Sequence, residues 1–209
     1  MATLLRMAAV RLYFAVGILW LALAGGAQAE PGEAGQFVRG LADDAIAVLS
    51  DENLTGEARE QAFRDLLRRG FDAPAVGRFV LGRYWNTADE AEREEFLQAF
   101  EDYVIATYAR RLGRYGGEQL VIAGERPESN GNAIVVSRIE LPDGPPIRVD
   151  WRLHQRDGSW RIIDIVVEQV SLLIAQRSEF ASVIRANRGD VSALSRLLRQ
   201  KVTQLAARS

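Results

Sequence analysis

Cysteine is absent from the sequence, and histidine and lysine occur once each, as His154 and Lys201. The lack of cysteine excludes disulfides and thiolate metal sites, and a single histidine excludes metal sites built from several imidazoles. We therefore expect no metal and no cofactor. Arginine supplies the remaining basic charge and is interleaved with 28 acidic residues, without a basic block. The net charge of −2 and this even mixture do not indicate a nucleic-acid partner.

Recognisable catalytic motifs are also lacking. The sequence contains no Gly-x-Ser-x-Gly nucleophile elbow, no phosphate-binding loop and no dinucleotide fingerprint. His154 falls among charged residues on one face of a predicted strand, which indicates a solvated side chain. Asp164, inside an apolar segment, could act as a general base in a small exported enzyme, but a buried carboxylate is more often paired with an arginine or a backbone N–H. We expect a protein that is not an enzyme.

The first 29 residues differ from the rest of the chain. Arg6 and Arg11 precede an uncharged, mostly apolar run over residues 12–29, which ends in Ala27-Gln28-Ala29. A positive start, a short apolar stretch and an Ala-x-Ala site predict a cleaved signal peptide over residues 1–29. A retained membrane anchor is the competing interpretation, although the run is barely long enough to span a bilayer. We expect residues 30–209 to form a single exported domain.

The remaining chain changes its hydrophobic period twice. Over residues 30–117 apolar side chains recur at helical spacing, and a Thr87-x-x-Glu90 capping box opens the longest helix. Residues 118–169 alternate with period two, and Asn130-Gly131 and Asp157-Gly158 predict tight turns between antiparallel strands. Residues 170–209 return to a helical pattern. This order predicts an α+β domain with four strands between two helical segments.

The segment from Ile162 to Ile174 is apolar on both faces of the predicted fourth strand, whereas the third strand, residues 147–154, alternates cleanly. A strand that is apolar on both sides must be covered on both sides or must line a cavity on one of them. Because protein interiors are normally close-packed, helices that fill both sides are the more common solution. The residue pattern alone therefore leaves a solid core and a ligand cavity both open.

Six motifs follow one another along residues 30–209. They are Gly77-Arg-Phe-Val-Leu-Gly-Arg-Tyr-Trp85, Phe96-x-x-x-Phe100, Thr107-Tyr-Ala-x-x-Leu112, Trp160-x-x-x-Asp164, Val-Val-Glu168-x-Val170-Ser171 and Gln176-Arg177-Ser-Glu-Phe180. Together they resemble the MlaC family, the periplasmic phospholipid-binding proteins also known from toluene tolerance. One departure is Gln169, where members usually carry a glycine that eases the bend after the strand. A hopanoid-associated branch of the family is an alternative placement.

The resemblance implies a strongly curved, mostly antiparallel four-stranded sheet of the nuclear-transport-factor type, wrapped by N- and C-terminal helices around an apolar cavity. It implies a monomeric periplasmic carrier that holds a phospholipid by its acyl chains without chemical change. It further implies transient contacts with an outer-membrane lipoprotein and porin complex and with an inner-membrane ABC transporter carrying an MCE-domain ring, which together maintain outer-membrane lipid asymmetry. An adaptor that bridges envelope complexes without lipid is a further alternative.

The implied cavity and the sequence periodicity together give an expected set of lipid-binding residues. They come from the long helix, from the sheet and from the segment that follows it: Phe100, Val104, Tyr108, Val135, Val149, Trp151, Ile163, Ile165, Val167, Val170, Leu173 and Ile174. The motif residues expected to be structural are Trp160, Asp164, Ser171, Arg177 and Phe180, and we expect no catalytic residue.

Overall fold

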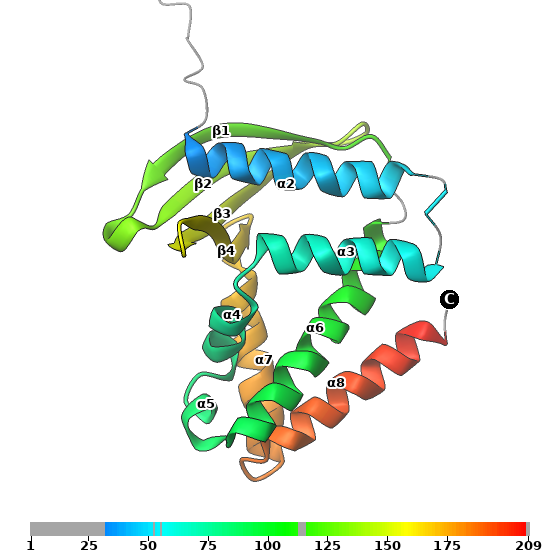
Figure 1. The fold of residues 1–209 in the computed structure, drawn as a ribbon, viewed down its shortest axis with the longest axis vertical. Coiled ribbons are helices and arrows are strands. Elements are labelled where there is room, and N and C mark those ends of the chain that lie inside the picture. Colours follow the sequence, from blue (N-terminus) through cyan, green and yellow to red (C-terminus); the bar gives the residue numbers. More distant parts are fainter. Residues whose placement is uncertain (1–31, 52, 55, 113–115, 208–209) are drawn as a thin grey trace, which may run out of the picture. The chain divides into compact units, whose positions relative to one another are not determined.

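The computed structural model describes residues 32–51, 53, 54, 56–112 and 116–207, and the predicted signal peptide with its cleavage site lies outside them. The described residues belong to one unit, Pro31–Ser209. Its helices are α2 (Glu33–Ser50), α3 (Gly56–Gly70), α4 (Ala73–Leu81), α5 (Tyr84–Thr87), α6 (Glu90–Leu112), α7 (Leu172–Ala186) and α8 (Val191–Ala206), with a short 3₁₀ turn, η1 (Ser129–Gly131) (Figure 1). Among these residues, no helix combines the length and the apolar character that crossing a bilayer requires.

Five strands form one antiparallel sheet. They are β1 (Gln119–Pro127), β2 (Ala133–Glu140), β3 (Ile147–Arg156), β4 (Ser159–Val167) and β5 (Val170–Ser171), and they lie in the order β1-β2-β3-β4-β5. Asn130 and Gly131 between β1 and β2, and Asp157 and Gly158 between β3 and β4, all have positive φ. Asn, Asp and Gly tolerate this conformation best, which is why these pairs predicted the turns correctly. The α+β prediction is confirmed.

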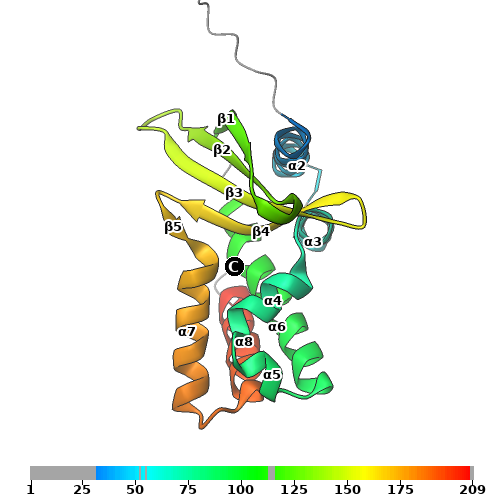
Figure 2. The same cartoon turned by 90° about the vertical axis from the view of Figure 1, so that its left-hand side faces the viewer.

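The sheet differs from the expected cone in strand number and in curvature. After β4, Glu168 and Gln169 adopt φ of 46° and 68° and turn the chain, so that Val170–Ser171 pair with Val167 and Val166. A two-residue strand is too short to show a period, so the prediction of four strands was wrong. The prediction of strong curvature was also wrong, because the sheet twists without rolling up and its edge strands β1 and β5 stay apart (Figures 1 and 2).

α2 lies along the sheet next to β1 and β2 (Figure 1). Val38 of α2 is buried together with Val135 of β2, Leu153 of β3 and Ile162 of β4, and these side chains form a core between helix and sheet. Helical spacing places one stripe of α2 on this core, and alternate residues of each strand face it. The contact fixes the first helix on the sheet.

A second core joins the helices to one another. The ring of Phe96 on α6 meets the ring of Phe180 on α7 edge to face, with 5.9 Å between centroids, and Leu194 and Leu198 of α8 are buried in the same cluster. α8 packs along α6, and α7 packs against α4 (Figure 2). A third, smaller cluster of Phe63, Leu66 and Ile105 joins α3 to α6, so the buried hydrophobic residues of the described chain are divided among one core on the sheet and two clusters within the helices.

Candidate functional site

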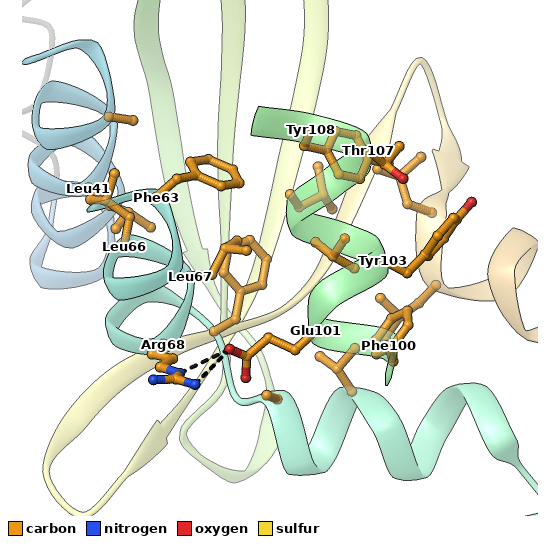
Figure 3. A pocket seen from close by; sticks show the side chains of 18 of the residues that line it. Leu41, Phe63, Leu66, Leu67, Arg68, Phe100, Glu101, Tyr103, Thr107 and Tyr108 are labelled. Carbon is orange, nitrogen blue, oxygen red and sulfur yellow. Dashed lines mark hydrogen bonds and ion pairs between the residues drawn. The ribbon is translucent and has the colours of Figure 1, made fainter. Parts of the chain in front are cut away.

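A cavity of about 390 Å³ lies between the sheet layer and the helices (Figure 3). Its wall is formed mainly by α2, α3, α4, α6 and α7, and only Trp151 of β3 and Ile165 of β4 come from the sheet. Tyr108, which lines the cavity, is itself exposed, so the cavity reaches the surface near the end of α6. Its volume falls within the range of roughly 300–1,000 Å³ found for sites that bind small molecules.

The wall of the cavity is almost entirely hydrocarbon. Its aliphatic and aromatic side chains are Val38, Leu41, Ala42, Ala45, Phe63, Leu66, Leu67, Phe71, Ala73, Val76, Leu97, Phe100, Tyr103, Val104, Tyr108, Trp151, Ile165, Leu172 and Leu173. The remaining lining residues are Arg68, Glu101, Thr107 and Gln176. Such a site binds apolar molecules through the removal of hydrocarbon from water and offers few groups that could orient a polar substrate.

The two charged lining residues are paired with each other where α3 approaches α6 (Figure 3). Nη2 of Arg68 lies 2.9 Å from Oε1 of Glu101, and Nη1 of Arg64 lies 3.0 Å from the same oxygen and 2.8 Å from Oδ1 of Asp102. Burial would lower the pKa of Arg64, but the hydrogen bonds and charges of Asp102 and Glu101 outweigh it, so that pKa is raised. The cluster is a bridge between two helices, and among the described lining residues no charge is left unpaired.

Six of the predicted lipid-binding residues line this cavity. They are Phe100, Val104 and Tyr108 from α6, Trp151 from β3, Ile165 from β4 and Leu173 from α7. They come from four elements that are far apart in the sequence, and the fold brings them to one surface. The long helix contributes most because its apolar stripe faces both the cavity and the helical core.

The other six predicted residues lie outside the lining. Val135 is buried in the core on the sheet, Val149 is buried on β3, and Ile163 and Val167 are half-buried on β4. The side chains of Val170 and Ile174 lie on the surface, 57% and 59% exposed. The sheet therefore contributes far less to the cavity than the sequence interpretation assumed.

A β-bulge explains why alternation along β4 does not separate the residues that line the cavity from those that do not. Leu153 pairs with Ile162 and Arg152 pairs with Asp164, so Ile163 is an extra residue in β4. Partners across an antiparallel pair point to the same face, so Ile162 and Ile165 share the face of β3 that carries Leu153 and Trp151. Ile163 therefore does not continue the series that includes Ile165. Because both faces of β4 are mostly apolar around the bulge, the shift in alternation is hidden in the sequence.

The sequence interpretation missed the contribution of the first helices. α2 places Leu41 and Ala45 in the wall, and α3 places Phe63, Leu66 and Leu67 there (Figure 3). These residues recur at helical spacing, so their apolar faces were visible in the sequence. The pattern could not show what those apolar faces contact, because a helix face that packs on protein and a helix face that lines a cavity have the same periodicity.

Asp164 occupies a structural position at the junction of β4 and α7. Its carboxylate accepts hydrogen bonds from the hydroxyl of Ser171 at 2.7 Å and from the backbone N–H of Leu173 at 3.2 Å. The Ser171 hydroxyl in turn caps α7 by accepting from the N–H of Ile174. The side chain that was the best candidate for a general base thus binds the first turn of a helix, which is a positioning role.

The other motif residues also contact protein. The guanidinium of Arg177 stacks over the ring of Phe79, 5.1 Å from its centroid. The same guanidinium lies over Gly82, where a Cβ atom would come within 2.9 Å of it. Phe180 belongs to the aromatic cluster of the helical core, and Trp160 packs against the core on the sheet.

A buried carboxylate, Asp72, joins the sheet to the start of α4. It accepts hydrogen bonds from the N–H of Ala75 at 3.0 Å and from Nη1 of Arg156 at 2.9 Å, and its second oxygen lies 2.9 Å from Nε2 of His154. The expectation that His154 is only solvated was therefore wrong, because its strand ends beside α4. No cluster of His, Cys, Asp and Glu side chains suited to a metal occurs in the described part of the chain.

Comparison with known proteins gives consistent matches. The model of the family described as MlaC protein matches residues 39–200. The intermembrane phospholipid transport system binding protein MlaC of Haemophilus influenzae is 26% identical over 133 residues, which are 62% of this chain and 61% of that protein. A toluene tolerance protein of Pseudomonas putida is 19% identical over 159 residues, 74% of each chain. The chain thus spans less than two thirds of the Haemophilus relative.

A solved structure shares the fold. The phospholipid-binding protein from Ralstonia solanacearum, determined in complex with a phospholipid, superposes with a TM-score of 0.75 over 84% of this chain and 99% of that one, at 23% sequence identity. At this identity the likeness establishes the fold alone. These relatives give no support to placement in a hopanoid-associated branch.

Proposed function

The chain belongs to the MlaC protein family, and from this premise we propose that it carries phospholipids between membranes, with the acyl chains held in the cavity described above. The observation that carries the proposal is the lining, in which the only charged side chains among the described residues, Arg68 and Glu101, are paired with each other. Such a wall suits hydrocarbon and offers no acid, base or nucleophile aimed at a substrate. The protein therefore carries its lipid without chemistry on it.

The energetics of an apolar wall suit a carrier. Each methylene group transferred from water into the cavity contributes about 0.8 kcal/mol, so acyl chains favour the cavity strongly over water. A bilayer offers the same chains a similar environment. The free energy of transfer between membrane and protein is therefore small, and lipid can be both loaded and released without an energy source in this protein.

The setting of the proposed function is the periplasm. A signal peptide over residues 1–29 would export the chain, and a single domain over residues 30–209 would act there as a monomer. Lipid would be exchanged with an outer-membrane lipoprotein and porin complex and with an inner-membrane ABC transporter that carries an MCE-domain ring. Cell fractionation and the intact mass of the exported protein test this setting, since cleavage after Ala29 predicts a chain that begins at Glu30.

Native mass spectrometry of protein purified from cells, followed by organic extraction, tests the cargo. We expect co-purified phospholipid on the natural chain. Val104→Trp places a large side chain in the cavity wall and should reduce the bound fraction at least severalfold, whereas Gln98→Trp adds the same side chain on an exposed face of α6 and should not. Natural protein that neither co-purifies with lipid nor extracts it from vesicles would rule out the carrier and favour a lipid-free adaptor.

A further inference from the structure

Of the four large hydrophobic side chains that are exposed in the described part of the chain, three lie on neighbouring elements. They are Phe79 of α4 at 39%, Val170 of β5 at 57% and Ile174 of α7 at 59%, whereas the fourth, Tyr108, lines the cavity. α4 packs against α7, and β5 leads directly into the first turn of α7 (Figure 2). Exposed apolar side chains that gather in one region mark a contact with another molecule.

Exposed arginines surround these apolar groups. Arg177 follows Ile174 by one turn on α7, and its guanidinium lies 5.1 Å from the centroid of the Phe79 ring, so it joins the exposed sides of the two helices. Arg78 precedes Phe79 on α4, and Arg83 follows the end of that helix. Among the described residues, no carboxylate forms an ion pair with any of these three arginines. We call this region the α4–α7 surface, and its members are Arg78, Phe79, Arg83, Val170, Ile174 and Arg177.

The acidic residues closest in sequence to the α4–α7 surface are engaged elsewhere. Asp164 is buried at the junction of β4 and α7. The carboxylate of Glu168 accepts from the backbone N–H of Arg148 at 2.6 Å, and Oε1 of Glu179 lies 3.5 Å from Nζ of Lys201 on α8. A positive region on a chain whose net charge is −2 favours contact with an anionic surface at that region alone.

From this arrangement we propose that the α4–α7 surface docks on the anionic face of a phospholipid bilayer, an inference that rests on the proposed carrier function. The arginines would pair with lipid phosphates, while the apolar side chains enter the layer at the depth of the head groups. Phe79, Val170 and Ile174 come from three elements and lie outside the cavity wall. Single apolar groups among arginines suit a fluid bilayer, which closes around each of them, whereas a folded partner would need a matching pocket for each.

The helices that carry the α4–α7 surface also carry part of the cavity wall. Ala73 and Val76 of α4 line the cavity, as do Leu172, Leu173 and Gln176 of α7. Docking through the exposed sides of these helices would therefore place the cavity one helix away from the bilayer. A lipid that leaves the bilayer there has only a short path outside a hydrocarbon environment.

Flotation of the purified protein with vesicles tests the contact. We expect the natural protein to float with vesicles of phosphatidylethanolamine and phosphatidylglycerol and to float far less with vesicles of phosphatidylcholine alone, and salt should weaken the binding. Ile174→Asp should reduce the partition coefficient by roughly tenfold, because it replaces an inserted apolar group by a charge of the same sign as the lipid. Gln98→Asp adds that charge to an exposed position of α6 and should have no such effect.

The contribution of the arginines is tested in the same assay. Arg78→Gln should reduce the partition coefficient by about fivefold, as expected for one arginine near an anionic membrane surface. Arg39→Gln removes an exposed arginine from α2 and should leave the partition coefficient unchanged. An equal loss in the two variants would show that binding follows overall charge and would overturn the assignment to the α4–α7 surface.

Binding of dioctanoyl phosphatidylglycerol below its critical micelle concentration separates this proposal from the carrier function, and Ile174→Asp should bind this soluble lipid as the natural protein does. If the natural protein does not bind it, the carrier function fails and the inference that rests on it falls as well. If the natural protein binds it but does not float, or if Ile174→Asp floats as well as Gln98→Asp, the membrane surface is overturned and the carrier stands. Sedimentation equilibrium supplies the last arm, because a dimer of the natural protein that Ile174→Asp dissociates would assign the surface to a second copy of the chain and overturn the bilayer contact.

Discussion

Asp72 is the residue at which the sheet, the chain after α3 and the start of α4 meet. The residue is 3% exposed, its carboxylate accepts from Ala75 and Arg156 and lies 2.9 Å from Nε2 of His154, and its backbone N–H donates to the carbonyl of Ile162. Burial would raise the pKa of Asp72, but the hydrogen bonds from Ala75 and Arg156 and the charge of Arg156 outweigh it, so the pKa is lowered. The charged form is therefore the one that stabilises the fold.

Asp72→Asn should lower the free energy of unfolding at pH 7 by about 1 kcal/mol, because it removes the charge and keeps an oxygen for the helix cap. A carboxyl whose pKa is depressed in the folded state contributes stability above the unfolded pKa, about 3.9, and loses it as the pH falls through the folded value. The difference between the two proteins should therefore vanish in strongly acidic buffer. Urea unfolding at pH 7 and near pH 2 measures it.

The exposed Asp143 provides the control for this substitution, since Asp143→Asn removes a charge from a loop and should change stability little at either pH. A deficit of Asp72→Asn that is as large in strong acid as at pH 7 would show that the carboxylate charge is not the stabilising element.

Gln169 has a backbone conformation that is unfavourable for any residue with a Cβ atom. With φ of 68° it lies in the left-handed region, next to Glu168 at 46°, in the two-residue turn between β4 and β5. Glycine adopts this region without the steric cost of a Cβ atom. Gln169→Gly should stabilise the protein by about 0.5–1 kcal/mol, since the strain removed exceeds the added entropy of the unfolded chain.

Thermal and urea unfolding measure this gain, and Gln155→Gly is the control because Gln155 is an exposed residue inside β3, where glycine should destabilise. Loss of stability in Gln169→Gly would contradict the assignment of strain to this turn.

At the scale of elements, α3 and α6 are joined across the cavity wall by the cluster of Arg64, Arg68, Glu101 and Asp102. Arg64 has a side chain only 19% exposed and reaches two carboxylates, so its contacts are less screened than those of a surface pair. A double-mutant cycle of Arg64→Ala and Glu101→Ala should therefore give a coupling energy of about 1 kcal/mol.

Urea unfolding of the four proteins in this cycle measures the coupling. The control is the exposed ion pair of Arg69 and Asp44, which joins α3 to α2. A double-mutant cycle of Arg69→Ala and Asp44→Ala should give a smaller coupling energy, since both side chains are mostly solvated. Coupling that is equal in the two cycles would show that the cluster beside the cavity has no special role in holding α3 on α6.

The sequence predicted the elements well and their mutual arrangement less well. Helices and strands could be predicted because the spacing of apolar residues shows which side of an element is buried. The bulge at Ile163 and the two-residue strand β5 could not be predicted, because both depend on pairing with a neighbouring strand. The contribution of α2 and α3 to the cavity was missed for a related reason, since Leu41 and Phe63 could equally have met solid protein.

At the scale of the whole described unit, the division of the buried hydrophobic residues into separate clusters makes room for the cavity. The sheet core is centred on Val135 and Leu153, and the helical core is centred on Phe96 and Phe180. The cavity lies between these cores, and residues of both line it, among them Val38 of the sheet core and Phe100 beside the helical core. An apolar void of this size lacks the packing contacts that fill ordinary interiors, so the protein without lipid carries a deficit of stability.

Lipid should remove that deficit. A ligand that binds only the folded state stabilises it by about 2.7 kcal/mol when its free concentration is one hundred times the Kd. For a chain of this size that corresponds to a rise in Tm of about 5–10 °C. Protein stripped of lipid by unfolding and refolding in the absence of lipid should therefore melt at a lower temperature than protein reloaded from vesicles. Differential scanning calorimetry measures the two melting temperatures.

The variant Val104→Trp, which places a large side chain in the wall of the cavity, should show a smaller difference in Tm between stripped and reloaded protein. The control Gln98→Trp should show the same difference as the natural protein. Equal melting temperatures for stripped and reloaded natural protein would mean that lipid does not bind the folded protein, and an equal rise in Val104→Trp and Gln98→Trp would mean that the cavity is not where it binds.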